Sequence, residues 1–346
     1  MKAPTDKYLD RLLRRETGWF LAICFIATYG LNAAVFFLAG PYADGSDAWR
    51  LALTFSMLIP ASSAILCLLL FRRAAIGTPV RIFFALFLAT LVLPILLKTF
   101  VAGPLFEIVQ TVLVLGGTMV IIILNLRQSW RAQLRPFGLA LERGIGFFAV
   151  FLLLYALMLA ASFALNPLFG LSRVNAEMPF TALVAQALLS LVMVIAGGWF
   201  VYFGEEYGWR YYLQHRLVAL YGSARGVLLL GLIWGLWHAP VIAMGYNYPG
   251  RPLLGVLAMT LFTVVIGIYF SFAVMRAGSV WPAVILHGLN NSIAPLLVAY
   301  FGDVSDRVFA FGIGLYGIAL FALPALWLLS RMRSGKVSQP AEFSLE

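Results

Sequence analysis

Charged residues are scarce in this 346-residue sequence. They make up 11% of the chain, whereas 62% of the residues are hydrophobic. An ordinary soluble domain has about a quarter of its residues charged, so the composition excludes that class. At about 20 apolar residues per bilayer crossing, the length accommodates about ten crossings and indicates a polytopic membrane protein.

Cysteines and internal repeats are also lacking. Cys24 and Cys67 are the only cysteines, and both lie in apolar runs. The sequence therefore has no disulfide framework and no CxxC redox motif, and we expect both cysteines to be small buried hydrophobes. No repeat of fixed period is visible, which argues against a transporter built from inverted repeats.

Ten apolar runs account for most of the chain. Each is about 20 to 24 residues long, which is enough to span a bilayer as a helix. The sequence therefore predicts an all-α transmembrane bundle of about ten helices. The runs are Trp19–Ala39, Leu51–Phe71, Ile82–Ala102, Leu105–Leu126, Ile145–Leu165, Phe180–Phe203, Gly226–Gly245, Leu253–Met275, Val280–Tyr300 and Val308–Leu329.

The net charge of +10 comes from basic residues in the connecting segments. With the N-terminus inside, nearly all of them fall on the cytoplasmic side, which follows the positive-inside rule and predicts two cytoplasmic termini. This distribution explains the charge without a nucleic-acid partner. The basic residues that fall on or near the outer side are Arg50, Lys98, Arg173, Arg251 and Arg307.

An acidic pair follows the sixth apolar run. Charged groups at bilayer depth cost about 2.5 to 3.5 kcal/mol each, so Glu205 and Glu206 require an explanation. Glu206 and Arg210 have i, i+4 spacing and can pair on one helix face. Glu205 points about 100° away from Glu206, so the two carboxylates can serve different partners. We interpret the aromatic residues beside them as a cytoplasmic interface belt: Trp209, Tyr211 and Tyr212.

Two histidines lie well inside apolar runs. In the seventh run, Trp234 and His238 have i, i+4 spacing, and Gly231 and Gly235 form a small-xxx-small face that allows close approach of a neighbouring helix.

In the ninth run, His287 and Asn291 have the same i, i+4 spacing and share one face. Asn290 points about 100° away from Asn291 and is the weaker candidate. A carboxylate, two imidazoles and an amide on three helices can activate water and stabilise an oxyanion.

The three motifs together resemble the CAAX prenyl protease and bacteriocin-processing family (CPBP, or Abi) of intramembrane endopeptidases. The family pattern is Glu-Glu-x-x-x-Arg, then Phe-x-x-x-His, then His-x-x-x-Asn. All three motifs occur here in order between about Phe180 and Tyr300, with Trp234 in place of the family's phenylalanine. The resemblance places a CPBP-type catalytic core in the C-terminal half and implies an integral protein of a bacterial plasma membrane.

The resemblance also implies a mechanism. Glu205 and His238 would activate the water that attacks a peptide carbonyl, and His287 and Asn291 would hold the oxyanion. Glu206, Arg210 and Trp234 would support them. The substrate would be a membrane protein or a lipidated peptide.

A zinc site is the alternative within the family, with Zn²⁺ held by Glu205, His238 and His287. We favour the glutamate because asparagine is a poor zinc ligand and neither histidine has an evident carboxylate partner in the sequence. No cofactor is therefore assigned.

Two non-protease functions remain open on the same residues. In a catalytically silent scaffold or immunity protein they would only hold helices together. In a proton-coupled transporter, Glu205, His238 and His287 would relay protons.

The expected organisation follows from these runs and motifs. It comprises a cytoplasmic segment (1–18), N-terminal transmembrane helices of unknown role (19–126), a basic cytoplasmic loop (127–143), the protease-like core (144–330) and a cytoplasmic tail (331–346). We expect the four site residues to meet in one cavity that opens toward the cytoplasmic half. Because Glu205 lies at the inner end of its run, this requires the sixth helix to bend or dip back into the bilayer.

Overall fold

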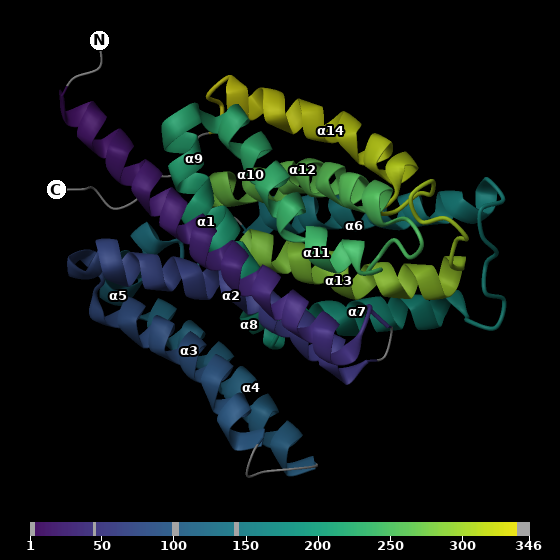
Figure 1. The fold of residues 1–346 in the computed structure, drawn as a ribbon, viewed down its shortest axis with the longest axis horizontal. Helices are drawn as coiled ribbons and strands as arrows, with labels where there is room; N and C mark the ends of the chain where they lie inside the picture. Colours follow the sequence, from purple (N-terminus) through teal and green to yellow (C-terminus); the bar gives the residue numbers. More distant parts are fainter. Residues whose placement is uncertain (1–3, 44–45, 99–103, 142–144, 338–346) are drawn as a thin grey trace.

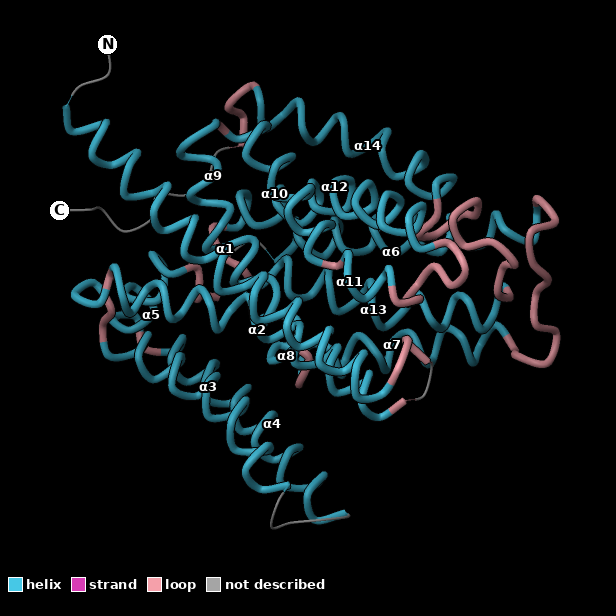
Figure 2. Tube along the Cα trace, viewed as in Figure 1, coloured by secondary structure: helices cyan, strands magenta, loops and turns pink. Residues whose placement is uncertain are grey.

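A computed structural model describes residues 4–43, 46–98, 104–141 and 145–337 (Figures 1 and 2). Every regular element in these ranges is a helix, so the predicted all-α fold is confirmed. The long helices are α1 (Pro4–Ala39), α2 (Asp47–Phe71), α3 (Thr78–Lys98), α4 (Pro104–Leu126), α6 (Ile145–Leu168), α7 (Phe180–Ala196), α12 (Pro252–Ala277), α13 (Trp281–Phe301) and α14 (Leu315–Arg333).

Shorter elements connect them. These are α5 (Gln128–Leu134), α8 (Trp199–Glu206), a π-helix (Tyr207–Leu213), α9 (Gln214–Tyr221), α10 (Ser223–Trp237) and α11 (Ala239–Ala243), with single 3₁₀ turns at Arg73–Ala75 and Arg135–Phe137.

Six helices among the described residues are long and apolar enough to cross a membrane, or up to eight segments if each of two bent pairs is one span. The third and seventh predicted runs correspond to shorter apolar helices, at Thr78–Leu93 and Ser223–Trp237. Residues 99–102 of the third run lie outside the described residues. Each predicted run thus contains a helix, and a total of ten crossings stays a prediction.

The sixth apolar run bends, as we expected if Glu205 is to reach the same cavity as the histidines. α7 and the helical stretch that begins with α8 meet at 70°, and the two residues between them are Gly197 and Gly198. A Cβ at Gly198 would lie 2.9 Å from the backbone of Val194, so a larger residue would obstruct the bend. Kinks at glycines are common because glycine tolerates unusual backbone geometry. The bend directs α8, which carries the acidic pair, into the bundle.

The first two helices belong to the packed core. Phe20 of α1 lies against Trp209 and Tyr212, with ring centroids 5.6 Å and 5.0 Å apart. α2 packs along α8 and the π-helix, while α3 and α4 form a hairpin that projects from the bundle (Figure 1). The N-terminal helices therefore cover the segment that carries the acidic pair.

The packing of this segment contradicts the interpretation of its aromatic residues as an interface belt. Trp209, Tyr211 and Tyr212 are at most 1% exposed, so they do not form an interface belt. Tyr211 stacks on Tyr207 with centroids 4.7 Å apart, and Trp209 meets Trp237 edge-on at 5.7 Å. The interpretation failed because Phe20 of α1 packs on Trp209 and Tyr212, and the turn at Arg135–Phe137 contacts Tyr211. The hydropathy of one segment does not reveal what covers it.

A buried ion cluster joins the same helices. The carboxylate of Glu16 on α1 accepts hydrogen bonds from Arg72, which follows α2, at 2.7 Å and from Arg216 of α9 at 2.9 Å. Glu16 and Arg216 are fully buried. Breaking such a buried pair is strongly destabilising because one charge is left without its partner.

Candidate active site

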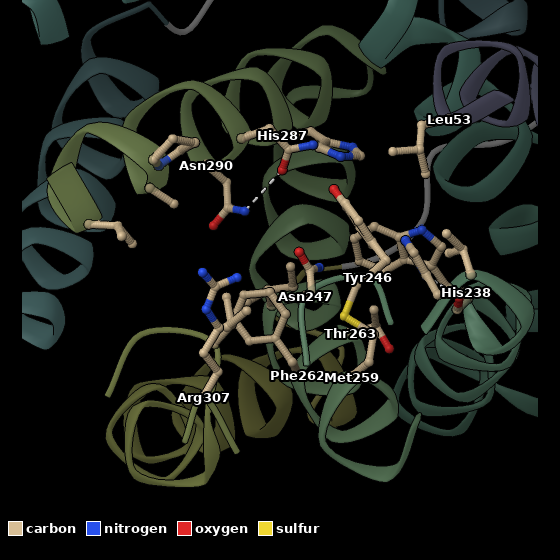
Figure 3. Close-up of a pocket in the computed structure, with 18 of the residues that line it drawn as sticks. Leu53, His238, Tyr246, Asn247, Met259, Phe262, Thr263, His287, Asn290 and Arg307 are labelled. Atoms are coloured by element: carbon tan, nitrogen blue, oxygen red, sulfur yellow. Dashed lines mark hydrogen bonds between the residues drawn. The ribbon is translucent and has the colours of Figure 1, made fainter. Parts of the chain in front are cut away.

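One cavity of about 490 Å³ lies among α1, α2, α8, α10, α12 and α13. Its lining includes all four residues that the motifs selected, which are Glu205, His238, His287 and Asn291. Figure 3 shows His287 and Asn290 on one side of this space and His238 on another. The structure therefore brings residues from three separate motifs to a single cavity.

The acidic pair divides between the cavity and the protein interior. Glu205 lines the cavity, and its Oε2 accepts a hydrogen bond from the indole Nε1 of Trp234 at 2.9 Å. Glu206 does not line the cavity. Its carboxylate lies 3.2 Å from Nε of Arg210, so the predicted ion pair forms. Both residues of that pair are fully buried.

Arg210 lies within the π-helix that runs from Tyr207 to Leu213. Short π-helical stretches are rare and occur frequently at functional sites. A wider turn at this point follows directly after the acidic pair and accommodates four buried aromatic side chains, namely Tyr207, Trp209, Tyr211 and Tyr212.

His287 has a carboxylate partner that sequence reasoning missed. Its Nδ1 lies 2.7 Å from Oε1 of Glu206, and both groups are buried. The earlier argument that neither histidine has a carboxylate partner is therefore wrong for His287. The two residues are 81 positions apart, and the packing of α13 against α8 that joins them has no signal in the local spacing.

His238 is oriented by the backbone. Its Nδ1 lies 2.8 Å from the carbonyl oxygen of Trp234. A carbonyl only accepts hydrogen bonds, so Nδ1 carries the proton and Nε2 is the basic nitrogen of the neutral ring. His238 follows the last residue of α10, where the helix gives way to α11. This end of α10 places the ring at the cavity wall.

Trp234 contacts most of the candidate residues. Besides its bond to Glu205, its ring lies 5.7 Å from the rings of both His238 and His287, measured between centroids. The guanidinium of Arg210 lies over it, 3.9 Å from the ring centre. The departure from the family's phenylalanine therefore has a consequence, because only an indole supplies the N–H that reaches Glu205.

Asn290 was judged the weaker amide, yet it lines the same cavity as Asn291. Its Nδ2 donates to Oδ1 of Asn291 at 3.1 Å, and its own Oδ1 accepts from the hydroxyl of Tyr155 at 2.9 Å. Helical spacing fixes the direction in which each side chain leaves the helix. The amide groups at the ends of two neighbouring side chains can still meet.

The structure offers no assembled set of ligands for the zinc alternative. Within the described residues, no group of three histidine, cysteine or acidic side chains is placed so that it could hold a metal ion. Glu205, His238 and His287 share the cavity, and their side chains form hydrogen bonds to Trp234 and Glu206. We therefore derive no step through a metal.

The N-terminal helices contribute part of the cavity wall, which sequence reasoning left open. Thr28 and Asn32 of α1 and Ser56 of α2 are buried and line it. The hydroxyl of Thr28 accepts a hydrogen bond from Nε1 of Trp237 at 2.8 Å. Thr28 and Asn32 are polar residues at i, i+4 inside an apolar run, which is the same kind of signal that identified the C-terminal motifs.

The cavity extends away from the termini. Beyond Asn291 its lining follows α13 to Gly302 and continues with Asp303, Val304 and Arg307. These residues lie at the opposite end of the bundle from the start of α1 and the end of α14 (Figure 1). That the cavity opens toward the cytoplasmic half stays a prediction.

The fold and this cavity define a polytopic helical membrane protein with a buried polar site. A family model described as "Type II CAAX prenyl endopeptidase Rce1-like" matches residues 185–293, so the resemblance inferred from the motifs is confirmed. The matched segment contains Glu205, His238, His287 and Asn291, and it supports a CAAX-type intramembrane protease. No curated protein matches the chain.

Proposed function

We propose that the protein is an intramembrane endopeptidase that uses a glutamate-activated water. One observation carries the proposal: Glu205, and not its neighbour Glu206, shares a single cavity with His238, His287 and Asn291. Lipid supplies no water and no partners for backbone groups, so hydrolysis inside a bilayer requires such a polar cavity.

In the proposed reaction, Glu205 takes a proton from water with the help of Nε2 of His238, and the resulting hydroxide attacks the peptide carbonyl. The negative charge that develops on the carbonyl oxygen is stabilised by Nδ2 of Asn291 and by Nε2–H of His287. His287 can donate from Nε2 only when its ring carries a proton on both nitrogens, because Nδ1 donates to Glu206. When the C–N bond breaks, the proton held by Glu205 passes to the departing amine. One water is consumed, and a carboxylic acid and an amine are formed.

Glu206, Arg210 and Trp234 act as supporting residues in this scheme. Glu206 holds the His287 ring through Nδ1, which turns the Nε2 edge of the ring toward the cavity. Arg210 balances the charge of Glu206. Trp234 holds Glu205 in place. Groups fixed in this way cost little reorganisation when charge develops.

The proposed substrate is a membrane-embedded or lipid-modified polypeptide, since those are the chains that a cavity within a transmembrane bundle meets. The cavity is lined by apolar side chains such as Phe262, Met259 and Phe163, and by the polar side chains of Asn247, Asp303 and Arg307. A lining of both kinds suits a polypeptide that has apolar and polar parts.

The test is cleavage by purified protein in lipid nanodiscs. The panel contains fluorogenic peptides with a farnesylated cysteine, the same peptides without the lipid, and transmembrane peptides. Glu205→Gln should lower turnover by about 10²- to 10⁴-fold, as expected for loss of a general base, with unchanged thermal stability. Treatment with a chelator should leave wild-type turnover intact.

Two matched substitutions serve as controls. Glu177→Gln changes an exposed loop carboxylate and should alter neither turnover nor stability. Glu206→Gln leaves Arg210 buried without its charged partner and should lower stability and turnover together, since breaking a buried pair costs about 3–5 kcal/mol. Wild-type turnover by Glu205→Gln, or no cleavage of any peptide by the wild type, would contradict the proposal and favour a silent scaffold.

A further inference from the structure

A chain of hydrogen bonds ends at the side chain of Asn291. It begins with the hydroxyl of Tyr155 on α6, which donates to Oδ1 of Asn290 at 2.9 Å. Nδ2 of Asn290 then donates to Oδ1 of Asn291 at 3.1 Å, the contact drawn as a dashed line in Figure 3. Tyr155 is 2% exposed and Asn290 is 7% exposed, so water does not compete freely for these bonds.

The chain has one direction. A carboxamide has an acceptor oxygen on one side and a donor NH₂ on the other. Because the tyrosine hydroxyl takes the oxygen of Asn290, the NH₂ of Asn290 is turned toward Asn291. That NH₂ takes the oxygen of Asn291, so the donor edge of Asn291 is directed away from Asn290. Asn291 lines the cavity, and its donor edge is therefore the edge available there.

The orientation of this amide decides whether it can stabilise an oxyanion. A donor NH₂ facing the developing negative oxygen stabilises it, whereas a carbonyl oxygen in the same place would repel it. An asparagine with no neighbour to fix it can adopt either orientation, which differ by rotation about one bond. A site that depends on an amide donor needs something to select the productive orientation.

We infer that Tyr155 and Asn290 are positioning residues that hold Asn291 with its NH₂ toward the reacting carbonyl. This inference rests on the proposed function. Neither residue touches the reacting atoms in the proposed reaction, and both act through Asn291.

Tyr155 is well placed for a clean test because its ring is held independently of its hydroxyl. The ring packs against Tyr269, Phe270 and Phe321, with centroids 5.7, 6.2 and 5.9 Å away. Tyr155→Phe therefore removes the first bond of the chain and keeps the packing. Tyr269 offers a matched control in the same aromatic cluster, because its hydroxyl donates to the carbonyl of Phe321 at 2.7 Å and does not contact the asparagines.

The experiment measures kcat and KM in nanodiscs on the peptide that the wild type cleaves best in the panel described above. Tyr155→Phe should lower kcat by about five- to tenfold, which is the usual effect of losing one hydrogen bond. KM should change little. Asn290→Leu, which has a similar volume and no amide, should lower kcat at least as much. Tyr269→Phe should leave kcat within about twofold of the wild type, since its bond lies outside the chain.

A double-mutant cycle separates positioning from general structural support. Asn291→Ala removes the oxyanion donor and should cost about 10²- to 10³-fold in kcat. Adding Tyr155→Phe to Asn291→Ala should cost no more than about twofold further, because residues that act through one another are not additive.

Equal losses from Tyr155→Phe in the two backgrounds, or an equal loss from Tyr269→Phe, would overturn the positioning inference and leave the protease proposal standing. An inactive wild type, or an active Glu205→Gln variant, would overturn both.

Discussion

Trp234 is the residue at which this chain departs from the family pattern, and its indole makes a bond that phenylalanine cannot make. Nε1 donates to Oε2 of Glu205 at 2.9 Å in a buried setting. A hydrogen bond to a charged group contributes about 1.5–3 kcal/mol. The carboxylate proposed to activate water is therefore more firmly oriented here than phenylalanine at position 234 would allow.

Trp234→Phe tests that bond by restoring the family's residue. We expect kcat to fall about tenfold, in line with the loss of one bond to a charged group, while the ring contacts to the two histidines are largely kept. The measurement is steady-state cleavage of the panel peptide together with thermal stability.

Trp281→Phe is the control for Trp234→Phe, since Trp281 donates its Nε1 to the carbonyl of Leu139 at 3.0 Å and does not line the cavity. An equal loss of kcat in both variants would contradict a specific role for Trp234.

At the scale of the helices, the close contact between α10 and α12 follows from the spacing of two glycines in the sequence. Gly231 and Gly235 face α12, and a Cβ on either would lie 2.5 Å from a backbone Cα atom, of Val264 and Thr260 respectively. Thr263 of α12 donates its hydroxyl to the carbonyl of Gly231 at 3.0 Å. Two small residues one turn apart thus let two backbones approach closely.

Gly235→Ala should separate α10 from α12. The added methyl group meets backbone rather than a flexible side-chain end, so the helices must move, and we expect a loss of about 1–3 kcal/mol of stability. Because α10 carries Trp234 and His238, turnover should fall as well. The readout is thermal unfolding in detergent beside the cleavage assay.

Gly30→Ala on α1 is the matched control for Gly235→Ala, because nothing lies within 4 Å of its added Cβ and alanine is the better helix former. Unchanged stability in Gly235→Ala would show that the close packing of α10 on α12 is not required.

The elements also show which parts of the site the sequence could predict. Pairs at i, i+4, such as Glu206 with Arg210 or His287 with Asn291, are local and can be recognised from spacing alone. The bond between Glu206 and His287 joins α8 to α13, and no local pattern encodes it. Thr28 and Asn32 did carry a local signal, but their place in the cavity wall depends on how α1 packs against the core.

For the whole molecule, the charge distribution predicts which way the bundle faces across the bilayer. By the positive-inside rule, the end with both termini is expected in the cytoplasm. The cavity extends to the other end, where Asp303 and Arg307 line it. At that end Arg307 pairs with Asp303 at 2.5 Å and Arg251 with Asp306 at 2.9 Å. With the predicted orientation, this end of the cavity would lie toward the non-cytoplasmic side.

Cysteine labelling in intact cells tests this arrangement. Cys24 and Cys67 are buried, so a substituted cysteine supplies the signal. Ser305 in the loop after α13 and Ser334 after α14 are both exposed and allow the same conservative change. We expect a membrane-impermeant maleimide to label Ser305→Cys in intact cells, and to label Ser334→Cys only in inverted vesicles or permeabilised cells. The opposite pattern would place the termini outside and turn the end of the cavity that Asp303 and Arg307 line toward the cytoplasm. Labelling of both positions from one side would contradict the bundle topology itself, because the two residues lie at opposite ends of α14, which runs from Leu315 to Arg333.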